Sequence, residues 1–84
     1  MKVVELYSKE ECHLCEIAKN ELQRLQRTHE FELRVRSIQE GDEYFEKYKE
    51  RVPVVLIDNE FAFQYHIPEH EFLAKLGQIP DSNT

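Results

Sequence analysis

Residues 3–15 read VVELYSKEECHLC, an apolar run followed by a polar break and two cysteines with two residues between them. The apolar run is rich in Val, Leu and Tyr and predicts a buried strand over residues 2–7. Beyond the cysteines, apolar residues recur at spacings of three and four, as in an amphipathic helix. Cys12 and Cys15 therefore lie where a strand and its loop lead into a helix. The function depends on whether the two cysteines form a redox pair, bind a metal ion, or occur at this spacing by chance.

The length and composition of the chain limit its size and its partners. Its 84 residues suffice for one compact domain, and the 40% of apolar residues can build a modest core. The net charge is −6, and the Lys and Arg residues are scattered along the sequence. Binding to nucleic acid through phosphate contacts is therefore not expected.

The sequence predicts no membrane segment and no secretory signal. No stretch approaches the roughly 20 apolar residues that cross a bilayer, and Glu5 comes too early for a signal peptide. We therefore expect a cytoplasmic monomer without a membrane partner. In that reducing compartment, cysteines at this spacing are more often catalytic or metal-binding than structural.

The first half of the chain predicts a helix, a strand and a short helix. The first helix begins near the cysteines, ends near residues 28–29 and turns one apolar face to the core. That face is formed by Leu14, Ile17, Ala18, Leu22 and Leu25. Residues 31–36 alternate between apolar and charged side chains, which predicts a strand buried on one face. After a break at residues 41–42, the aromatic side chains within residues 44–48 indicate a short amphipathic helix.

The second half predicts a hairpin and a last helix. Residues 54–57 are continuously apolar and rich in β-branched side chains, which indicates a central strand covered on both faces. Residues 58–59, Asp and Asn, supply a tight turn, and residues 61–65 follow with period two as the return strand. Pro68 can occupy the first turn of the last helix, for which Gly77 is the expected stop. The apolar residues of this helix are Phe72, Leu73 and Leu76.

These elements follow one another as strand, helix, strand, helix, strand, strand and helix. The first crossover implies a parallel pair of strands in a right-handed unit, and the hairpin adds an antiparallel pair. The predicted fold class is therefore α/β, with a mixed four-stranded sheet flanked by helices. We expect residues 1–78 to form this domain and residues 79–84 to be a loose C-terminal tail.

Three features of this layout resemble the glutaredoxin-like family of the thioredoxin superfamily. They are residues 6–9 leading into the CHLC motif, Val52-Pro53 before a buried strand, and the hairpin and helix that follow. The resemblance, closest to small and mostly bacterial members, implies a thioredoxin/glutaredoxin-like fold and thiol–disulfide oxidoreductase activity. It also implies that the Val52–Pro53 bond is cis and faces the cysteines, which leaves the backbone of Val52 free to pair with an extended substrate. Alternatively, Pro53 begins a strand, where its missing N–H is harmless.

The chain departs from typical glutaredoxins after its fourth strand. Those proteins have a Gly-Gly and acidic segment there that holds the γ-glutamyl end of glutathione, whereas residues 63–68 of this chain read FQYHIP. Glutathione is therefore a possible but disfavoured reductant, and a reductase of the thioredoxin-reductase type is the other candidate. His66 could replace part of a glutathione site, although a surface histidine is the commoner case.

The position of the cysteines predicts different roles for the two thiols. Disulfide exchange needs a thiolate, whereas a free cysteine with a pKa of about 8.5 is mostly protonated at neutral pH. The unpaired N–H groups and partial positive charge of a helix N-terminus favour the anion, and Cys12 lies where it can use them. Cys15 is one turn further along and less exposed. We therefore expect Cys12 to be the nucleophile and Cys15 the resolving thiol.

The charges around the motif act on Cys12 in opposite directions. Lys9 should favour its thiolate, whereas three nearby carboxylates should disfavour it. These are Glu10, Glu11 and Glu16. We expect a thiol less acidic than in strongly oxidising relatives, and hence a reductant. Residues 8–11 also match a capping box, which would start the helix at Ser8, but we prefer the family's start at or next to Cys12.

We predict catalytic roles for Cys12 and Cys15 and substrate-binding roles for Lys9, Val52 and Pro53. Lys9 is a candidate contact for a substrate carboxylate. The only cofactor expected is the redox-active disulfide itself, with no bound metal. The expected substrates are disulfides of proteins or small molecules, reduced at the expense of a reductase or glutathione.

The alternative is a non-enzymatic thioredoxin-fold module that binds a metal or a partner protein through the same surface. A metal site would combine Cys12 and Cys15 with His66 and His70, a Cys₂His₂ set that zinc accepts. The long separation between the cysteines and the histidines is unlike the spacing of zinc fingers. The redox pair is therefore the preferred interpretation.

Overall fold

The computed structural model describes residues 2–77, and its secondary structure follows the predicted order. The elements are β1 (Val3–Ser8), α1 (His13–Gln26), β2 (Glu32–Ser37), α2 (Glu43–Tyr48), β3 (Val54–Ile57), β4 (Glu60–Gln64) and α3 (Glu69–Leu76). None of the helices in this range is long and apolar enough to cross a membrane. The expected tail, residues 79–84, and residue 78 at the expected end of the domain lie outside the described residues.

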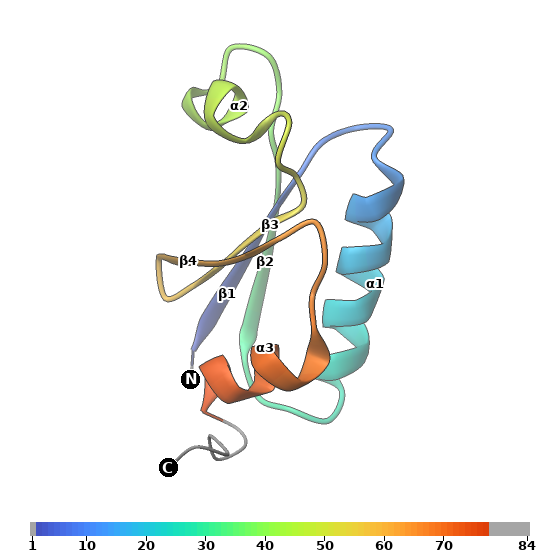
Figure 1. Ribbon diagram of the computed structural model, residues 1–84, viewed down its shortest axis with the longest axis vertical. Helices are drawn as coiled ribbons and strands as arrows, with labels where there is room; N and C mark the ends of the chain where they lie inside the picture. Colours follow the sequence, from blue (N-terminus) through green and yellow to red (C-terminus); the bar gives the residue numbers. More distant parts are fainter. Residues whose placement is uncertain (1, 78–84) are drawn as a thin grey trace.

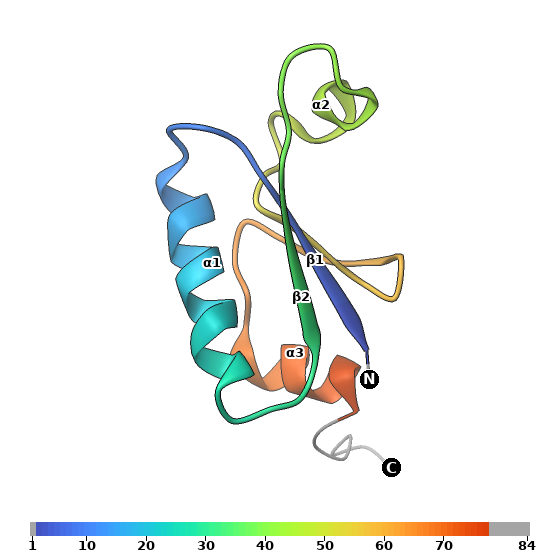
Figure 2. The same cartoon turned by 180° about the vertical axis from the view of Figure 1, so that it is seen from behind.

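The four strands form one mixed sheet in the order β2-β1-β3-β4. β1 and β2 are parallel, whereas β1–β3 and β3–β4 are antiparallel pairs. α1 and α3 lie on one face of this sheet, and α2 lies on the other, near the end of β1 that leads into α1 (Figures 1 and 2). The predicted α/β class, with a mixed four-stranded sheet and flanking helices, is therefore confirmed.

Most of the buried side chains pack between the sheet and the helices α1 and α3. Val4 and Leu6 of β1 point to this side and are fully buried. Leu22 of α1 and Phe72 of α3 belong to the same cluster and are also fully buried. The ring of Phe72 meets that of Phe31 edge-on, with centroids 5.5 Å apart. Every residue of β3 is buried, which confirms the prediction of a strand covered on both faces.

A smaller buried cluster lies on the other face of the sheet, under α2. Tyr48 of α2 packs there against Tyr7 of β1, with ring centroids 5.3 Å apart. Tyr44, one turn earlier on α2, stacks parallel to Tyr48 with centroids 6.0 Å apart. Because α2 has only six residues, it covers only part of this face.

The buried face of α1 differs from the predicted one. Its buried residues are Cys15, Ala18, Leu22 and Leu25. Leu14 and Ile17, which were predicted to share the core face, are 40% and 50% exposed. Each lies one position before a buried residue, and one residue corresponds to a rotation of about 100° around the helix. A spacing of three and four residues fits a buried stripe that begins at Leu14 and also one that begins at Cys15. The stripe that begins at Cys15 is the one that faces the sheet.

The prediction that β2 is buried along one whole face is also wrong. Phe31, just before the strand, is buried and Leu33 packs partly against the core, but Val35 is 44% exposed. β2 is an edge strand with β1 as its only neighbour in the sheet. Side chains on such an edge have fewer neighbours, so the alternation in sequence gives burial only at the start of the strand.

The turns confirm the expected ends of β3 and α3. Asp58 and Asn59 have φ values of 50° and 69°, the left-handed backbone of a tight hairpin. The carboxylate of Asp58 accepts a hydrogen bond from the Val3 N–H at 2.9 Å, which ties this hairpin to the start of β1. Gly77 ends α3 with a φ of 82°. Pro68 is the residue before α3 rather than part of its first turn.

The same substitution at two leucines of α1 should distinguish its buried face from its exposed one. Leu22→Ala leaves a cavity in the core and should lower the free energy of unfolding by about 2–5 kcal/mol. Leu14→Ala, at a position that is 40% exposed, should lower it by less than about 1 kcal/mol. Urea unfolding of the disulfide-bonded proteins, followed by circular dichroism, measures both values. Equal losses would contradict the assignment of the two faces.

Candidate active site

Cys12 and Cys15 form a disulfide bond where the loop after β1 meets the first turn of α1, with Cα atoms 5.2 Å apart. Cys12 is the N-cap residue of the helix and has an extended backbone, with φ −110° and ψ 105°. Its sulfur accepts a hydrogen bond from the Cys15 N–H at 3.2 Å, and its carbonyl accepts one from the Glu16 N–H at 3.2 Å. The helix therefore starts at His13, and the alternative start at Ser8 is wrong.

This position favours the thiolate of Cys12 once the disulfide is reduced. The first N–H groups of a helix have no partners within the helix, and here one of them already points at the Cys12 sulfur. The partial positive charge of the helix N-terminus acts in the same direction. A thiol in such surroundings gives up its proton more readily than one on an open surface.

The two cysteines differ in access. Cys15 is 4% exposed and belongs to the smaller cluster, together with Tyr7, Val52 and Val54. Cys12 is partly buried and packs against the edge of that cluster. The predicted difference in exposure is therefore present. The side chain of Cys12 is therefore partly accessible from solvent, whereas that of Cys15 is buried.

The loop before β3 lies beside the disulfide. The Val52–Pro53 peptide bond is cis, and the side chain of Val52 is buried in the cluster that contains Cys15. The backbone of Val52 is not wholly free, in contrast to the expectation, because its N–H donates to the Tyr48 carbonyl at 3.0 Å. This bond closes the turn that follows α2. Substrate binding by Val52 stays a prediction, and the bond to Tyr48 limits it to the Val52 carbonyl.

Tyr65 holds the same loop from the other side. It was predicted to end the return strand, but β4 ends at Gln64 and Tyr65 has a φ of 68°. Its N–H donates to the Pro53 carbonyl at 2.8 Å, and its hydroxyl donates to the Glu50 carbonyl at 3.2 Å. Arg51 adds a third link, from its Nε to the side-chain oxygen of Gln64 at 2.8 Å. No local pattern marks this role, because both partners lie more than ten residues away in sequence.

Lys9 is exposed, but its amino group is bound to the backbone of another segment. Its Nζ donates to the carbonyl of Lys49 at 2.7 Å. The bond joins the loop before the cysteines to the end of α2, two segments that are far apart in the sequence. The contact of Lys9 with a substrate carboxylate stays a prediction, and the amino group would have to leave Lys49 to make it.

The residues of the alternative metal site are not brought together. Within residues 2–77, no three His, Cys, Asp or Glu side chains lie close enough to hold a metal ion as one set. His66 and His70 are exposed. They do not combine with Cys12 and Cys15 into a Cys₂His₂ cluster.

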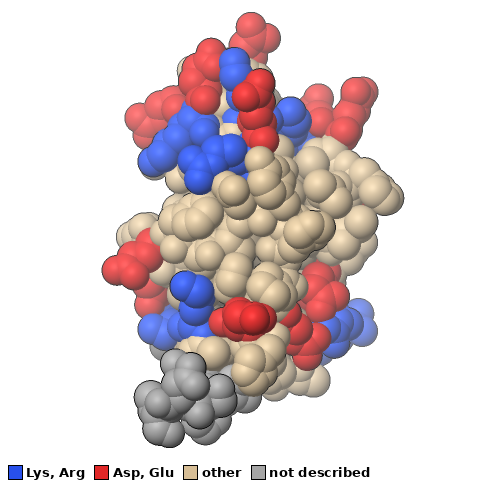
Figure 3. Space-filling model, in the orientation of Figure 1, with Lys and Arg blue, Asp and Glu red and all other residues tan. Residues whose placement is uncertain are grey.

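A hollow of about 490 Å³ opens beside Cys12. It is lined by residues 8–13, by Glu16 of α1 and by Ser37 at the end of β2. We call it the acidic hollow, because three of its lining side chains are exposed carboxylates. Figure 3 shows acidic side chains at the upper right, where the loop between β1 and α1 lies. Glu11, the residue before Cys12, has a φ of 58°. Residues other than Gly, Asn and Asp rarely adopt this left-handed backbone conformation.

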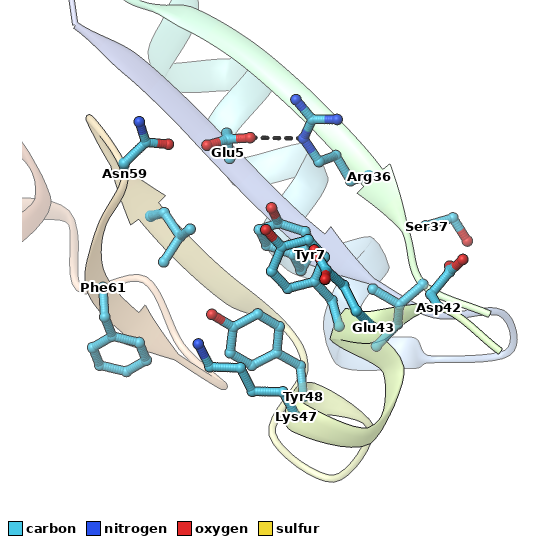
Figure 4. Close-up of a pocket in the computed structure, with 13 residues that line it drawn as sticks. Glu5, Tyr7, Arg36, Ser37, Asp42, Glu43, Lys47, Tyr48, Asn59 and Phe61 are labelled. Atoms are coloured by element: carbon cyan, nitrogen blue, oxygen red, sulfur yellow. Dashed lines mark hydrogen bonds and ion pairs between the residues drawn. The ribbon is translucent and has the colours of Figure 1, made fainter. Parts of the chain in front are cut away.

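A larger hollow, of about 830 Å³, lies on the sheet face that α2 leaves uncovered (Figure 4). Glu5 of β1, a buried carboxylate, accepts a hydrogen bond there from Arg36 of β2 at 2.7 Å. Tyr7 and Tyr48 line the same hollow and pack with Cys15 on their other side. Burial, and then the charge of Glu5, raise the pKa of the Tyr7 phenol. In the sequence, the sign of the Glu5–Arg36 pair was Glu5 itself, a charged residue inside an otherwise apolar strand.

The fold and the disulfide together define the class of the protein. A mixed four-stranded sheet in which a CxxC pair caps the first helix, opposite a proline loop, is the arrangement of thioredoxin-fold proteins. The sequence model described as Glutaredoxin-like domain (DUF836) matches residues 3–77, and the chain belongs to this family. No curated protein sequence matches the chain. Membership of this family and the CxxC disulfide indicate a redox function.

Tyr7 should make the stability of the protein fall at high pH. Because the folded protein raises the pKa of Tyr7, it favours the neutral phenol. This contribution to stability is complete below the ordinary pKa of about 10 and is lost as the pH rises through the folded-state value. Tyr7→Phe cannot ionise. Above about pH 10 it should lose stability less steeply than the wild type, by up to about 1.4 kcal/mol per pH unit.

Urea unfolding of the disulfide-bonded proteins at a series of alkaline pH values measures this difference. The two proteins are compared by the slope of stability against pH, so a constant difference between them at neutral pH does not enter. If Tyr7→Phe follows the wild-type slope, the folded protein does not raise the pKa of Tyr7.

Proposed function

We propose that the protein is a thiol–disulfide oxidoreductase that reduces disulfides of proteins or small molecules through Cys12 and Cys15. The observation that carries the proposal is the asymmetry of the disulfide. Cys12 is accessible at the N-cap of α1, and Cys15 is buried beneath it with its N–H directed at the Cys12 sulfur. This arrangement suits one attacking thiol and one resolving thiol.

The first step starts from the dithiol form. The Cys12 thiolate attacks one sulfur of the substrate disulfide and forms a bond to it. The other substrate sulfur leaves as a thiolate and takes up a proton. The N–H groups at the start of α1 stabilise the attacking thiolate before the reaction. The product is a mixed disulfide between Cys12 and half of the substrate.

The second step releases the rest of the substrate. Cys15 loses its proton and attacks the Cys12 sulfur, and the remaining substrate sulfur leaves and is protonated to a thiol. The substrate has then gained two electrons and two protons, and the protein carries the Cys12–Cys15 disulfide. The Cα separation of 5.2 Å lies within the usual range for such a bond. Burial of Cys15 keeps it from reacting with a substrate before Cys12 does.

An extended substrate would run along the loop that contains Val52 and Pro53. Since the Val52 N–H is bound to Tyr48, we assign to the Val52 carbonyl the role of accepting a hydrogen bond from the substrate backbone. The substrate backbone would therefore form one hydrogen bond with Val52, to its carbonyl, and none to its N–H. The attacked sulfur would then lie over the partly exposed Cys12, which borders the same cluster.

The electron donor that we favour is a reductase of the thioredoxin-reductase type rather than glutathione. The segment after β4 lacks the glycine pair and acidic residues of glutathione-binding relatives. Its Gln64 and Tyr65 side chains are engaged with Arg51 and Glu50, respectively. This leaves few groups in the segment to hold a glutathione molecule. We place the reaction in the cytoplasm and on a monomer.

Substitution of each cysteine by serine should separate the two steps. Cys12→Ser should lower reduction of 2-hydroxyethyl disulfide to the uncatalysed rate, because the attacking thiolate is gone. Cys15→Ser should stop after the first step and retain half of the substrate on Cys12, which intact-protein mass spectrometry detects as an added 2-mercaptoethanol group. Circular dichroism controls for the fold of both variants.

The outcome that contradicts the proposal is equally specific. A wild-type protein that shows no dithiol–disulfide couple and binds stoichiometric zinc or iron would instead support a non-enzymatic metal-binding module.

The reduction potential should be that of a reductant. Three carboxylates near Cys12 offset part of the stabilisation that the helix gives to its thiolate. We therefore expect a value closer to the about −270 mV of thioredoxin than to the about −120 mV of DsbA. Equilibration with dithiothreitol buffers, followed by thiol alkylation and mass spectrometry, measures it. A value near that of DsbA would reverse the proposed direction of electron flow and leave the exchange chemistry intact.

A further inference from the structure

We propose that this site reduces disulfides that carry positive charge next to the attacked sulfur in preference to those that carry negative charge. The inference rests on the proposed function, because it concerns the substrates of the Cys12–Cys15 pair. The preferred substrates of the site are then cationic small disulfides, or protein disulfides with Lys or Arg beside the reacting cysteine.

The geometry of the acidic hollow carries the proposal. Cys12, to whose sulfur a substrate becomes bonded in the first step, lines this hollow. Glu10 and Glu11 line it from the loop, and Glu16 lines it from the first turn of α1. All three side chains are exposed. Groups that flank the reacting sulfur of a substrate must therefore enter a space bordered by three carboxylates.

The cations nearest to the hollow do not cancel these charges. Within residues 2–77, Lys9 is the only Lys or Arg that lines it, and its amino group is bound to the Lys49 carbonyl. The amino group of Lys49 is in turn paired with Glu46 at 2.7 Å. Of the described residues that line the hollow, His13 is the other group able to carry positive charge. Even with a charge on His13, the three carboxylates outnumber the two positive groups.

The effect on the reaction follows from electrostatics. Carboxylates around a reacting atom raise the local concentration of cationic substrates and lower that of anionic ones, and salt weakens both effects. The whole chain also carries a net charge of −6, which acts in the same direction without being specific to the site. A test therefore has to separate the charges of the hollow from those of the rest of the surface.

Three small disulfides that differ in charge provide the test. Cystamine carries two ammonium groups, 2-hydroxyethyl disulfide is neutral, and 3,3′-dithiodipropionate carries two carboxylates. The full-length dithiol protein is mixed with each disulfide at about pH 8, and its loss of thiols is followed in a single turnover. Each rate is divided by the rate of the same disulfide with 2-mercaptoethanol, which corrects for intrinsic reactivity. The measured quantity is the corrected ratio of cystamine to dithiodipropionate.

We expect this ratio to be about tenfold or more at low ionic strength and less than about threefold in concentrated salt. The variant Glu10→Gln/Glu11→Gln/Glu16→Gln should lose most of the ratio. The matched control, Glu30→Gln/Glu60→Gln/Glu71→Gln, removes the same number of charges from exposed positions outside the hollow and should keep most of it. Because each ratio is taken within one protein, a change in the reactivity of Cys12 cancels.

The results separate this inference from the proposed function. A wild-type ratio near one, or equal ratios in the two triple variants, overturns the charge preference. If 2-hydroxyethyl disulfide is reduced normally in that case, the oxidoreductase itself stands. A protein that reduces none of the three disulfides overturns the proposed function, and the charge preference is overturned with it.

Discussion

The packing of the first turn of α1 against the loop around Pro53 is the contact on which the rest of the site depends. Cys15 is buried there with Tyr7, Val52 and Val54. Because Cys15 points into this cluster, the helix is fixed in rotation, and its N-cap residue, Cys12, is left at the surface. A helix that began one turn earlier would carry Cys12 past the unpaired N–H groups and remove their stabilising effect on its sulfur.

Much of this arrangement could be predicted from the sequence. Apolar spacing along the chain gives the order of the elements, and the continuous run in β3 marks the strand that is buried on both faces. The position of the CxxC pair after β1 places both thiols near the start of a helix. The exact first residue of that helix could not be read from the local sequence, since residues 8–11 also fit a capping box. The start is decided by the burial of Cys15, which is a tertiary contact.

Several features that could not be predicted depend on partners that are distant in the sequence. Lys9 is held by Lys49, and the Tyr65 N–H is held by Pro53, so neither bond is visible in a local pattern. Exposure of Leu14 has a different cause. Two helical stripes fit the apolar spacing of α1, and the stripe that begins at Cys15 is the one that faces the core. The burial of a cysteine is not evident from a pattern of aliphatic residues alone.

The pairing of β1 with β3 has a consequence for how the protein is made. This pairing sets residue 4 opposite residue 57 and residue 7 opposite residue 54, so β1 pairs with a strand that is synthesised much later. Synthesis starts at the N-terminus, and both cysteines are therefore made before the loop that covers Cys15. A chain that still lacks this loop cannot bury Cys15 against it. The division of the two cysteines into an outer and an inner thiol comes only with the second half of the sheet.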